Sequence, residues 1–191
     1  MTIDNDLIQW AAQHATSLLS PLGSRWLHVQ GVVERAKEIG EILNQQDQAS
    51  LIAAAYLHDI GYAPELQKTG FHPLDGALYL RSLGKERLAS LVAHHSEARF
   101  EARLRGCEAA LEAFPREHSA VADALTYCDL TTDPMGQSIS LKERAKDIYT
   151  RYGELDVVTQ AMRQSMPYVS LAIARTKRRL RKHEKSMEVI R

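Results

Sequence analysis

The chain has 191 residues, of which 45% are apolar and 25% are charged, and its 24 basic residues balance 24 acidic ones. This composition is typical of a globular protein, and the balanced charge gives neither an overall basic field that would attract nucleic acid nor the acidic excess of a disordered tail. The two cysteines are too few for a disulfide framework, and no stretch approaches the roughly 18 apolar residues that span a membrane. The N-terminus lacks the basic start of a signal peptide, so we expect a cytoplasmic protein without membrane contact.

Hydrophobic periodicity predicts an all-α chain, because apolar residues recur at helical spacing and no run alternates as in a strand. Gly61 is expected to end the third helix in a left-handed C-cap, and residues 99–115 stay unassigned. The simplest organisation is one domain with an N-terminal helix (1–23), a core (24–135) and C-terminal helices that complete it (136–191). Eight helices are expected, at about 4–19, 24–43, 48–60, 73–84, 85–98, 117–130, 141–152 and 156–181.

Three of these helices carry a metal-binding side chain where an apolar one is expected: His28, His58 and Asp129. Burying a lone carboxylate is costly unless it is paired or bound to a metal, and imidazole with carboxylate suits first-row divalent ions. Asp59 adds a second carboxylate beside His58. A single inward histidine is more often a hydrogen-bonded core residue, so the combination, and no one residue, indicates a metal site.

The order His28, His58-Asp59, Asp129 resembles the HD superfamily of metal-dependent phosphohydrolases. The surrounding sequences agree with that family: RWLHVQGV, AAAYLHDIGY and ADALTYCDLTT. The similarity covers roughly residues 24–135. It implies a single-domain HD-type helical bundle with a metal site in its core, where these four residues hold the first metal.

Two further segments resemble those of dinuclear members: FHPLDGALYL, with His72, and LVAHHSEAR, with His94 and His95. The resemblance implies a second metal held by His72 and His94, with Asp59 as the bridge and His95 near the substrate. Periodicity instead places His95 in the apolar stripe of its helix. For His72 the alternative is capping of the helix that begins at Pro73. We expect one or two divalent ions per chain, of Mn, Fe, Ni, Co, Mg or Zn.

The resemblance implies hydrolysis of a small phosphate ester or phosphoanhydride, with a nucleotide favoured, by attack of a metal-activated hydroxide. Asp59 would orient the hydroxide. Arg25, one turn before His28, and Lys68, in the loop after Asp59, are candidates to hold the phosphate, although ordinary solvated charge is as good an interpretation of each. The expected partner is therefore a phosphorylated metabolite or nucleotide, with no nucleic acid, and the oligomeric state is left open.

Two other classes of function stay open. A few HD-fold proteins are di-iron oxygenases with a similar ligand set, and an HD module can also bind a nucleotide without turning it over. The last predicted helix adds a basic run, for which a solvated helix end is favoured over contact with nucleic acid or anionic metabolites. That run comprises Arg175, Lys177, Arg178, Arg179, Arg181 and Lys182.

Overall fold

The computed structural model describes residues 3–190, and side chains up to residue 188. Within residues 3–190 there is no β-strand, and a single bridge joins Thr132 to Ser138. The all-α expectation is therefore confirmed. The helices are α1 (Asn5–Leu19), α2 (Ser24–Gly40), α3 (Gln45–Leu57), α4 (His72–Ser82), α5 (Glu86–His94), α6 (Arg99–Leu104), α7 (Glu108–Glu112), α8 (Ala120–Leu130), α9 (Leu141–Tyr152) and α10 (Val157–Ile190). Short 3-10 turns include η2 (Ile60–Tyr62) and η4 (His95–Glu97).

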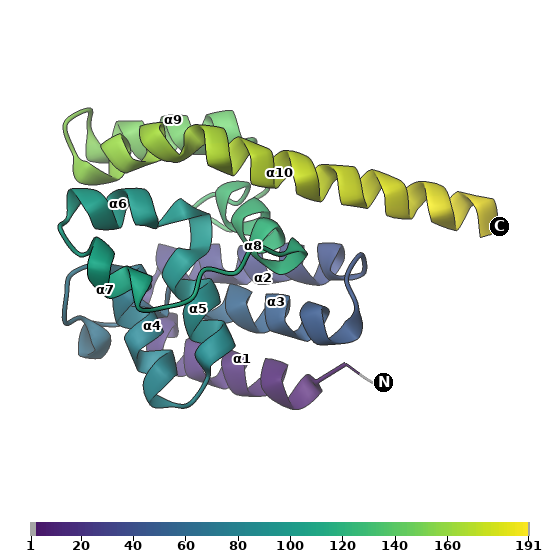
Figure 1. Cartoon of the computed structure of the whole chain (residues 1–191), viewed down its shortest axis with the longest axis horizontal. Coiled ribbons are helices and arrows are strands. Elements are labelled where there is room, and N and C mark those ends of the chain that lie inside the picture. Colours follow the sequence, from purple (N-terminus) through teal and green to yellow (C-terminus); the bar gives the residue numbers. More distant parts are fainter. Residues whose placement is uncertain (1–2, 191) are drawn as a thin grey trace.

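Helix α3 lies at the centre of the bundle and packs against α1, α2, α5 and α8 (Figure 1). Most of its residues are buried, among them three consecutive alanines at 53–55 that have no exposed surface. Their small side chains allow the surrounding helices to approach closely. Because α3 ends inside the bundle, the two residues that follow it, His58 and Asp59, are also buried.

Each predicted helix is present; most ends differ by a few residues, but α10 runs to Ile190, well past the predicted end at residue 181. Helix α3 stops at Leu57, before the predicted residue 60, because η2 takes over the chain there. The unassigned residues 99–115 contain the short helices α6 and α7. Several helix starts are fixed by a side-chain oxygen that accepts a hydrogen bond from a backbone N–H of the first turn. These capping residues are Asp4, Asn44, Ser119 and Ser140.

Gly61 does not form the predicted left-handed C-cap, since it lies inside η2 and outside the positive-φ residues. Its role is close packing: a Cβ there would lie 2.1 Å from the His72 carbonyl oxygen and 2.6 Å from the Gly76 nitrogen. Gly31 of α2 makes a similar approach, with a Cβ that would lie 2.3 Å from the Gly136 carbonyl oxygen. The two glycines thus let η2 and α2 contact neighbouring backbone directly.

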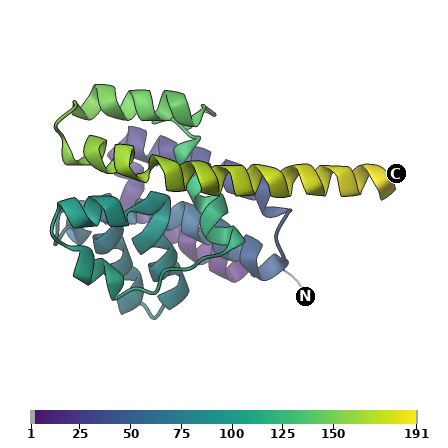
Figure 2. The ribbon, with the colours of Figure 1, turned by 45° about the horizontal axis from the view of Figure 1, so that its top comes forward.

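Helices α9 and α10 form a smaller second core with the end of α8, which includes Leu130, Ile148, Met162 and Val169. Helix α10 packs on α6, α8 and α9, and its C-terminal part projects beyond the rest of the molecule (Figures 1 and 2). Among the described residues, no helix has the length and apolar character needed to cross a membrane.

Candidate metal centre

Six residues with metal-binding side chains meet where α2, α4 and α8 surround the end of α3. They form two groups, and within each group one donor atom per residue lies within 4.8 Å of the others. The first group is His28, His58 and Asp129, and the second is Asp59, His72 and His95. The groups adjoin because His58 and Asp59 are consecutive, with 3.5 Å between His58 Nε2 and Asp59 Oδ2.

Hydrogen bonds to the main chain orient the two histidines of the first group. His28 Nδ1 lies 3.1 Å from the Asp133 carbonyl oxygen, and His58 Nδ1 lies 2.8 Å from that of Ala55. A carbonyl oxygen only accepts, so each Nδ1 carries the proton and each Nε2 keeps its lone pair. His28 Nε2 lies 3.1 Å from Asp129 Oδ1, whereas the buried His58 Nε2 has no hydrogen-bond partner.

The second group is oriented in the same way. His95 Nδ1 donates to the Val92 carbonyl oxygen at 2.6 Å, which leaves its Nε2 unprotonated. That atom lies 3.3 Å from His72 Nε2, which in turn lies 3.3 Å from Asp59 Oδ1. His72 makes no capping hydrogen bond at the start of α4, and its ring stacks on Tyr62 with 4.1 Å between the centroids. The capping alternative for His72 is therefore not what the structure shows.

The charge states of the site suit a bound cation. Burial lowers the pKa of His58, and lowers that of His72 to about 4, so both rings are neutral at pH 7. Burial acts to raise the pKa of Asp59, but Arg25, His58 and His72 outweigh it and hold that pKa well below its usual range. Burial also acts to raise the pKa of Asp129, but the neighbouring His28, His58 and Arg144 outweigh it and lower that pKa.

The residues of the two groups are chemically suited to hold a divalent metal ion. The site offers unprotonated imidazole nitrogens and ionised carboxylates, which are the forms that bind divalent ions. The buried Nε2 of His58 has no partner among the described residues, and a cation would satisfy it. Each main-chain carbonyl behind an Nδ1 is the outer partner that metal-ligating histidines usually have.

Comparison with known proteins agrees with this geometry. A sequence model described as HD domain matches residues 25–151, more than half of the chain. The chain belongs to the HD domain family. No curated protein and no solved structure gave a significant match. HD domain proteins bind divalent metals and are mostly metal-dependent hydrolases, and the matched segment contains all six residues of the two groups.

Arg25 lies beside Asp59, in agreement with the prediction that it faces the metal site. Its Nη1 donates to Asp59 Oδ2 at 2.5 Å, and its guanidinium lies over the Tyr62 ring, 4.0 Å from the centroid. Burial opposes its charge, but Asp59 outweighs that effect and raises the pKa of Arg25. Arg25 therefore balances part of the negative charge of the HD site.

A cavity adjoins the two groups, and a second cation lies in it: Arg144 of α9, which the sequence did not predict. The cavity has a volume of about 150 Å³ and is lined by Arg25 and Arg144, but Lys68 is exposed and does not line it. Arg144 is 7% exposed, its Nε is buried without a partner, and its Nη2 lies 3.9 Å from Asp129 Oδ1. The structure thus places Arg144, and not Lys68, among the cations of the HD cavity.

The choice between the two adjacent histidines also changes. The structure brings His95 into the second group, whereas His94 Nε2 donates to the Phe114 carbonyl oxygen at 2.7 Å. The expectation that His94 lies with the other candidate ligands is wrong, and His95 takes that place. The physical reason is that α5 ends at His94, and its buried stripe of Leu88, Leu91 and Val92 is continued by His95.

The metal centre contains one more residue that the sequence did not predict, Ser96. Ser96 donates a short hydrogen bond from its hydroxyl to Asp129 Oδ2. Ser96 and Glu97 both have positive φ, 50° and 61°, although neither is glycine. Such left-handed residues cost about 1–3 kcal/mol each and persist only where their surroundings hold them. The strained turn η4 therefore presents His95 and Ser96 to the site from two successive positions.

Proposed function

We propose that this protein is a metal-dependent phosphohydrolase that acts on a small phosphate ester or phosphoanhydride, with a nucleotide as the favoured substrate. The observation that carries the proposal is a cavity in which two adjoining His/Asp groups face Arg25 and Arg144, while a third arginine of the lining, Arg151, is paired with Asp147. Hydrolysis forms a bond between phosphorus and a water oxygen and breaks the bond to the leaving group, which takes up a proton. The cavity has side chains that could hold the metal ions and cationic side chains that could bind the anionic substrate.

The two groups would hold the divalent ions. His28, His58 and Asp129 would hold one ion, and Asp59, His72 and His95 the other. A divalent ion bound there lowers the pKa of a water molecule toward about 7 and polarises the phosphoryl oxygens. The protein's contribution is to fix the ligands: three of the four imidazoles are locked by main-chain carbonyls, and Asp129 is held by Ser96.

The arginines would bind the phosphate. Arg144 has an unpartnered N–H inside the protein, which is costly to bury unless it serves a ligand. Arg25 is now tied to Asp59, and that attraction weakens once the carboxylate shares its charge with a cation. Guanidinium groups donate two parallel hydrogen bonds to phosphate oxygens, so the pair can orient the group from two sides.

The cavity also limits the substrate. Its volume of about 150 Å³ admits a phosphate group and little more, so the remainder of the substrate would extend toward the opening. Tyr62 and Tyr152 line the cavity, and Tyr152 is partly exposed. An exposed aromatic ring beside a phosphate site suits a flat apolar group such as a nucleobase, which supports a nucleotide.

The test is a panel of phosphate esters and anhydrides, assayed with each candidate divalent metal. We expect wild-type protein to release phosphate from at least one compound. Asp59→Asn should lower kcat/KM more than about a hundredfold, since loss of even an outer-shell partner costs 10–100-fold. Asp47→Asn is the matched control, because Asp47 begins α3 and pairs with Arg87, away from the cavity.

Three outcomes would contradict the proposed function or its assigned site. Oxygen consumption without phosphate release would favour the di-iron oxygenase alternative. Tight nucleotide binding with no turnover by metal-loaded protein would favour a regulatory module. Full activity of Asp59→Asn would show that the catalytic site lies elsewhere.

A further inference from the structure

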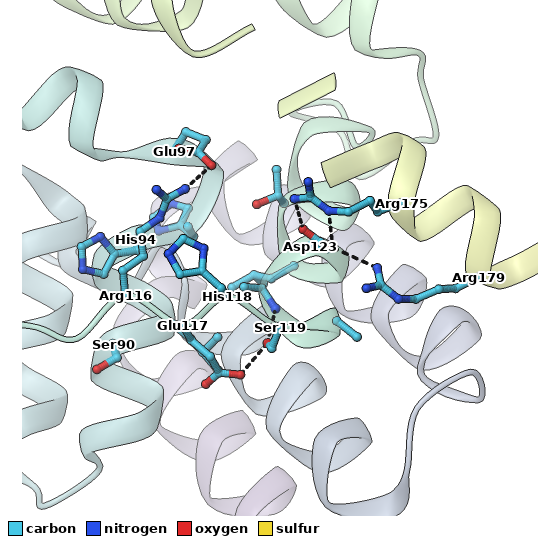
Figure 3. A pocket seen from close by; sticks show the side chains of 16 residues that line it. Ser90, His94, Glu97, Arg116, Glu117, His118, Ser119, Asp123, Arg175 and Arg179 are labelled. Carbon is cyan, nitrogen blue, oxygen red and sulfur yellow. Dashed lines mark hydrogen bonds and ion pairs between the residues drawn. The ribbon is translucent and has the colours of Figure 1, made fainter. Parts of the chain in front are cut away.

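A second cavity, larger than the metal cavity, lies between α5, η4, α8 and α10 (Figure 3). Its volume is about 420 Å³. Among the described residues, the two cavities share only His95 in their linings. The lining of the second cavity is strongly charged, and Figure 3 shows Arg116 beside Glu97 on one side and Arg175 and Arg179 around Asp123 on the other.

Two of the carboxylates of this lining each have two arginine partners. Asp123 accepts two hydrogen bonds from Arg175, at 2.8 and 2.5 Å, and one from Arg179, at 2.9 Å. Glu97 is paired with Arg116 and, at 2.9 Å, with Arg99. One arginine is enough to neutralise one carboxylate, so each cluster has an excess of one positive charge.

The arginines also have hydrogen-bond donors to spare. A guanidinium has five N–H donors, yet Arg116 and Arg179 each donate only one hydrogen bond among the described residues. Their side chains are 29% and 34% exposed, so the remaining donors are accessible from solvent. Helix α8 begins at this cavity, and Ala120, its first residue, lines it. The partial positive charge of a helix N-terminus adds to that of the arginines.

A third carboxylate, Glu117, limits the excess without cancelling it. Glu117 accepts hydrogen bonds from Arg87 at 2.9 and 3.0 Å and from Ser119 at 2.5 Å. Arg87 also pairs with Asp47, so this cluster is negative overall. In Figure 3 Glu117 lies on the side away from Glu97 and Asp123, and its oxygens are already engaged by donors of the protein.

We propose that the second cavity binds a small phosphate-bearing anion, separately from the metal centre. The free donors come from Arg116 before α8, from Arg179 on α10 and from the first turn of α8, which line the cavity on different sides. A phosphate group has three terminal oxygens that accept hydrogen bonds from several sides, whereas one guanidinium fork is enough to satisfy a planar carboxylate. The divergent donors therefore favour phosphate over a carboxylate ligand.

The experiment is thermal unfolding of the full-length, metal-loaded protein as inorganic phosphate replaces chloride at constant ionic strength. A ligand that binds the folded state raises Tm with concentration, which yields an apparent Kd. The test variant is Arg116→Gln combined with Arg179→Gln, which leaves Glu97 with Arg99 and Asp123 with Arg175. The matched control is Arg178→Gln, since Arg178 is exposed on α10 and forms no ion pair among the described residues.

We expect the test variant to bind phosphate about tenfold more weakly or worse, because a charge-assisted hydrogen bond contributes 1.4 kcal/mol or more, with Arg178→Gln like wild type. Asp59→Asn should keep this phosphate site, which separates it from the proposed catalytic function. If the phosphate effect disappears in Asp59→Asn and persists in the test variant, phosphate binds only at the metal centre and the proposal is wrong. No effect of phosphate on wild type would also overturn it.

Discussion

At the residue scale, the metal centre depends on which nitrogen of each imidazole is free. Main-chain carbonyls accept a hydrogen bond from Nδ1 of His28, His58 and His95, so that in the neutral rings each Nε2 has a lone pair available for a metal. His94 uses its Nε2 on the Phe114 carbonyl oxygen. The two adjacent histidines therefore differ in the atom that they can offer, although their side chains are identical.

This difference gives a direct prediction for a pair of variants. His95→Asn should lower the affinity for the second metal more than about a hundredfold, on the scale of effects known for partners of metal ligands. His94→Asn should keep the metal content of wild type, because it removes only a hydrogen bond to Phe114. Elemental analysis after dialysis against limiting chelator measures both. Equal metal loss in the two variants would show that the second group does not bind metal as assigned.

The sequence was sufficient for His28, His58, Asp59 and Asp129, because each can be placed from its own helix and its neighbours. Ser96 could not be found in this way, since its hydrogen bond to Asp129 depends on a left-handed turn that no helical pattern predicts. Arg144 was missed for another reason. It belongs to a polar helix, α9, and it is buried only because of the way that helix packs in the fold.

At the scale of elements, close backbone packing sets the distance between the segments that carry the candidate ligands. Gly61 of η2 lies against the first turns of α4, and an added Cβ would meet main-chain atoms, which cannot turn away. Asp59 precedes this contact and His72 belongs to it. The separation of these two ligands is therefore determined by the size of residue 61.

Gly61→Ala should accordingly destabilise the protein by about 3 kcal/mol, at the upper end of typical overpacking costs, and weaken binding of the second metal. Gly40→Ala is the control: its Cβ would meet only the flexible side chain of Gln48, and alanine is favoured over glycine in a helix. Urea unfolding of both variants measures the difference. Similar midpoints for the two would mean that the Gly61 contact relaxes without cost.

Helix positions were predicted well, whereas helix ends were not. Periodicity extends α3 to residue 60, but the chain tightens into η2 once the close contact of Gly61 with α4 is formed. That contact joins η2 to a separate helix, so local sequence does not reveal it. Residues 99–115 form α6 and α7, which are too short to show a clear hydrophobic period.

At the scale of the whole molecule, Arg87 ties distant segments together. It donates to Glu117, in the segment before α8, and to Asp47, at the start of α3. The hydrogen bond from Arg87 is the main cause that lowers the pKa of Glu117. The unfolded chain therefore binds a proton at Glu117 at a higher pH than the folded protein does. The contribution of Glu117 to the free energy of unfolding decreases as the pH drops below the ordinary pKa of glutamate.

Glu117→Gln should reduce Tm near neutral pH, where the ionised pair stabilises the fold, and the difference from wild type should shrink as the pH falls through the lowered folded-state pKa of Glu117, where the group becomes protonated in both states. Arg87 keeps Asp47 as a partner in this variant. Glu112→Gln, an exposed residue that forms no ion pair among the described residues, is the control. A Tm difference that is constant from pH 7 to pH 3 would contradict the assigned role of the charge.

The all-α architecture followed from the sequence, but the placement of α10 did not. The sequence favoured a solvated helix end for its basic run, but Arg175 and Arg179 form ion pairs with Asp123 of α8. Those pairs form when α10 packs along α8, a contact between residues more than fifty positions apart. The second cavity exists only because of that packing.

The left-handed turn at Ser96 and Glu97 has a consequence for the order in which the protein assembles. In an unfolded chain neither residue favours this conformation, and the groups that hold it belong to other segments: Asp129 on α8 and Arg116 before it. We therefore expect the turn to be stable only once α8 has packed against it. We accordingly expect His95 to reach its position late in folding. In the unfolded chain, His58 and Asp59 are the only two of the six candidate ligands that are adjacent in sequence. Metal uptake should then follow folding, and a cation should not act as the nucleus around which this chain folds.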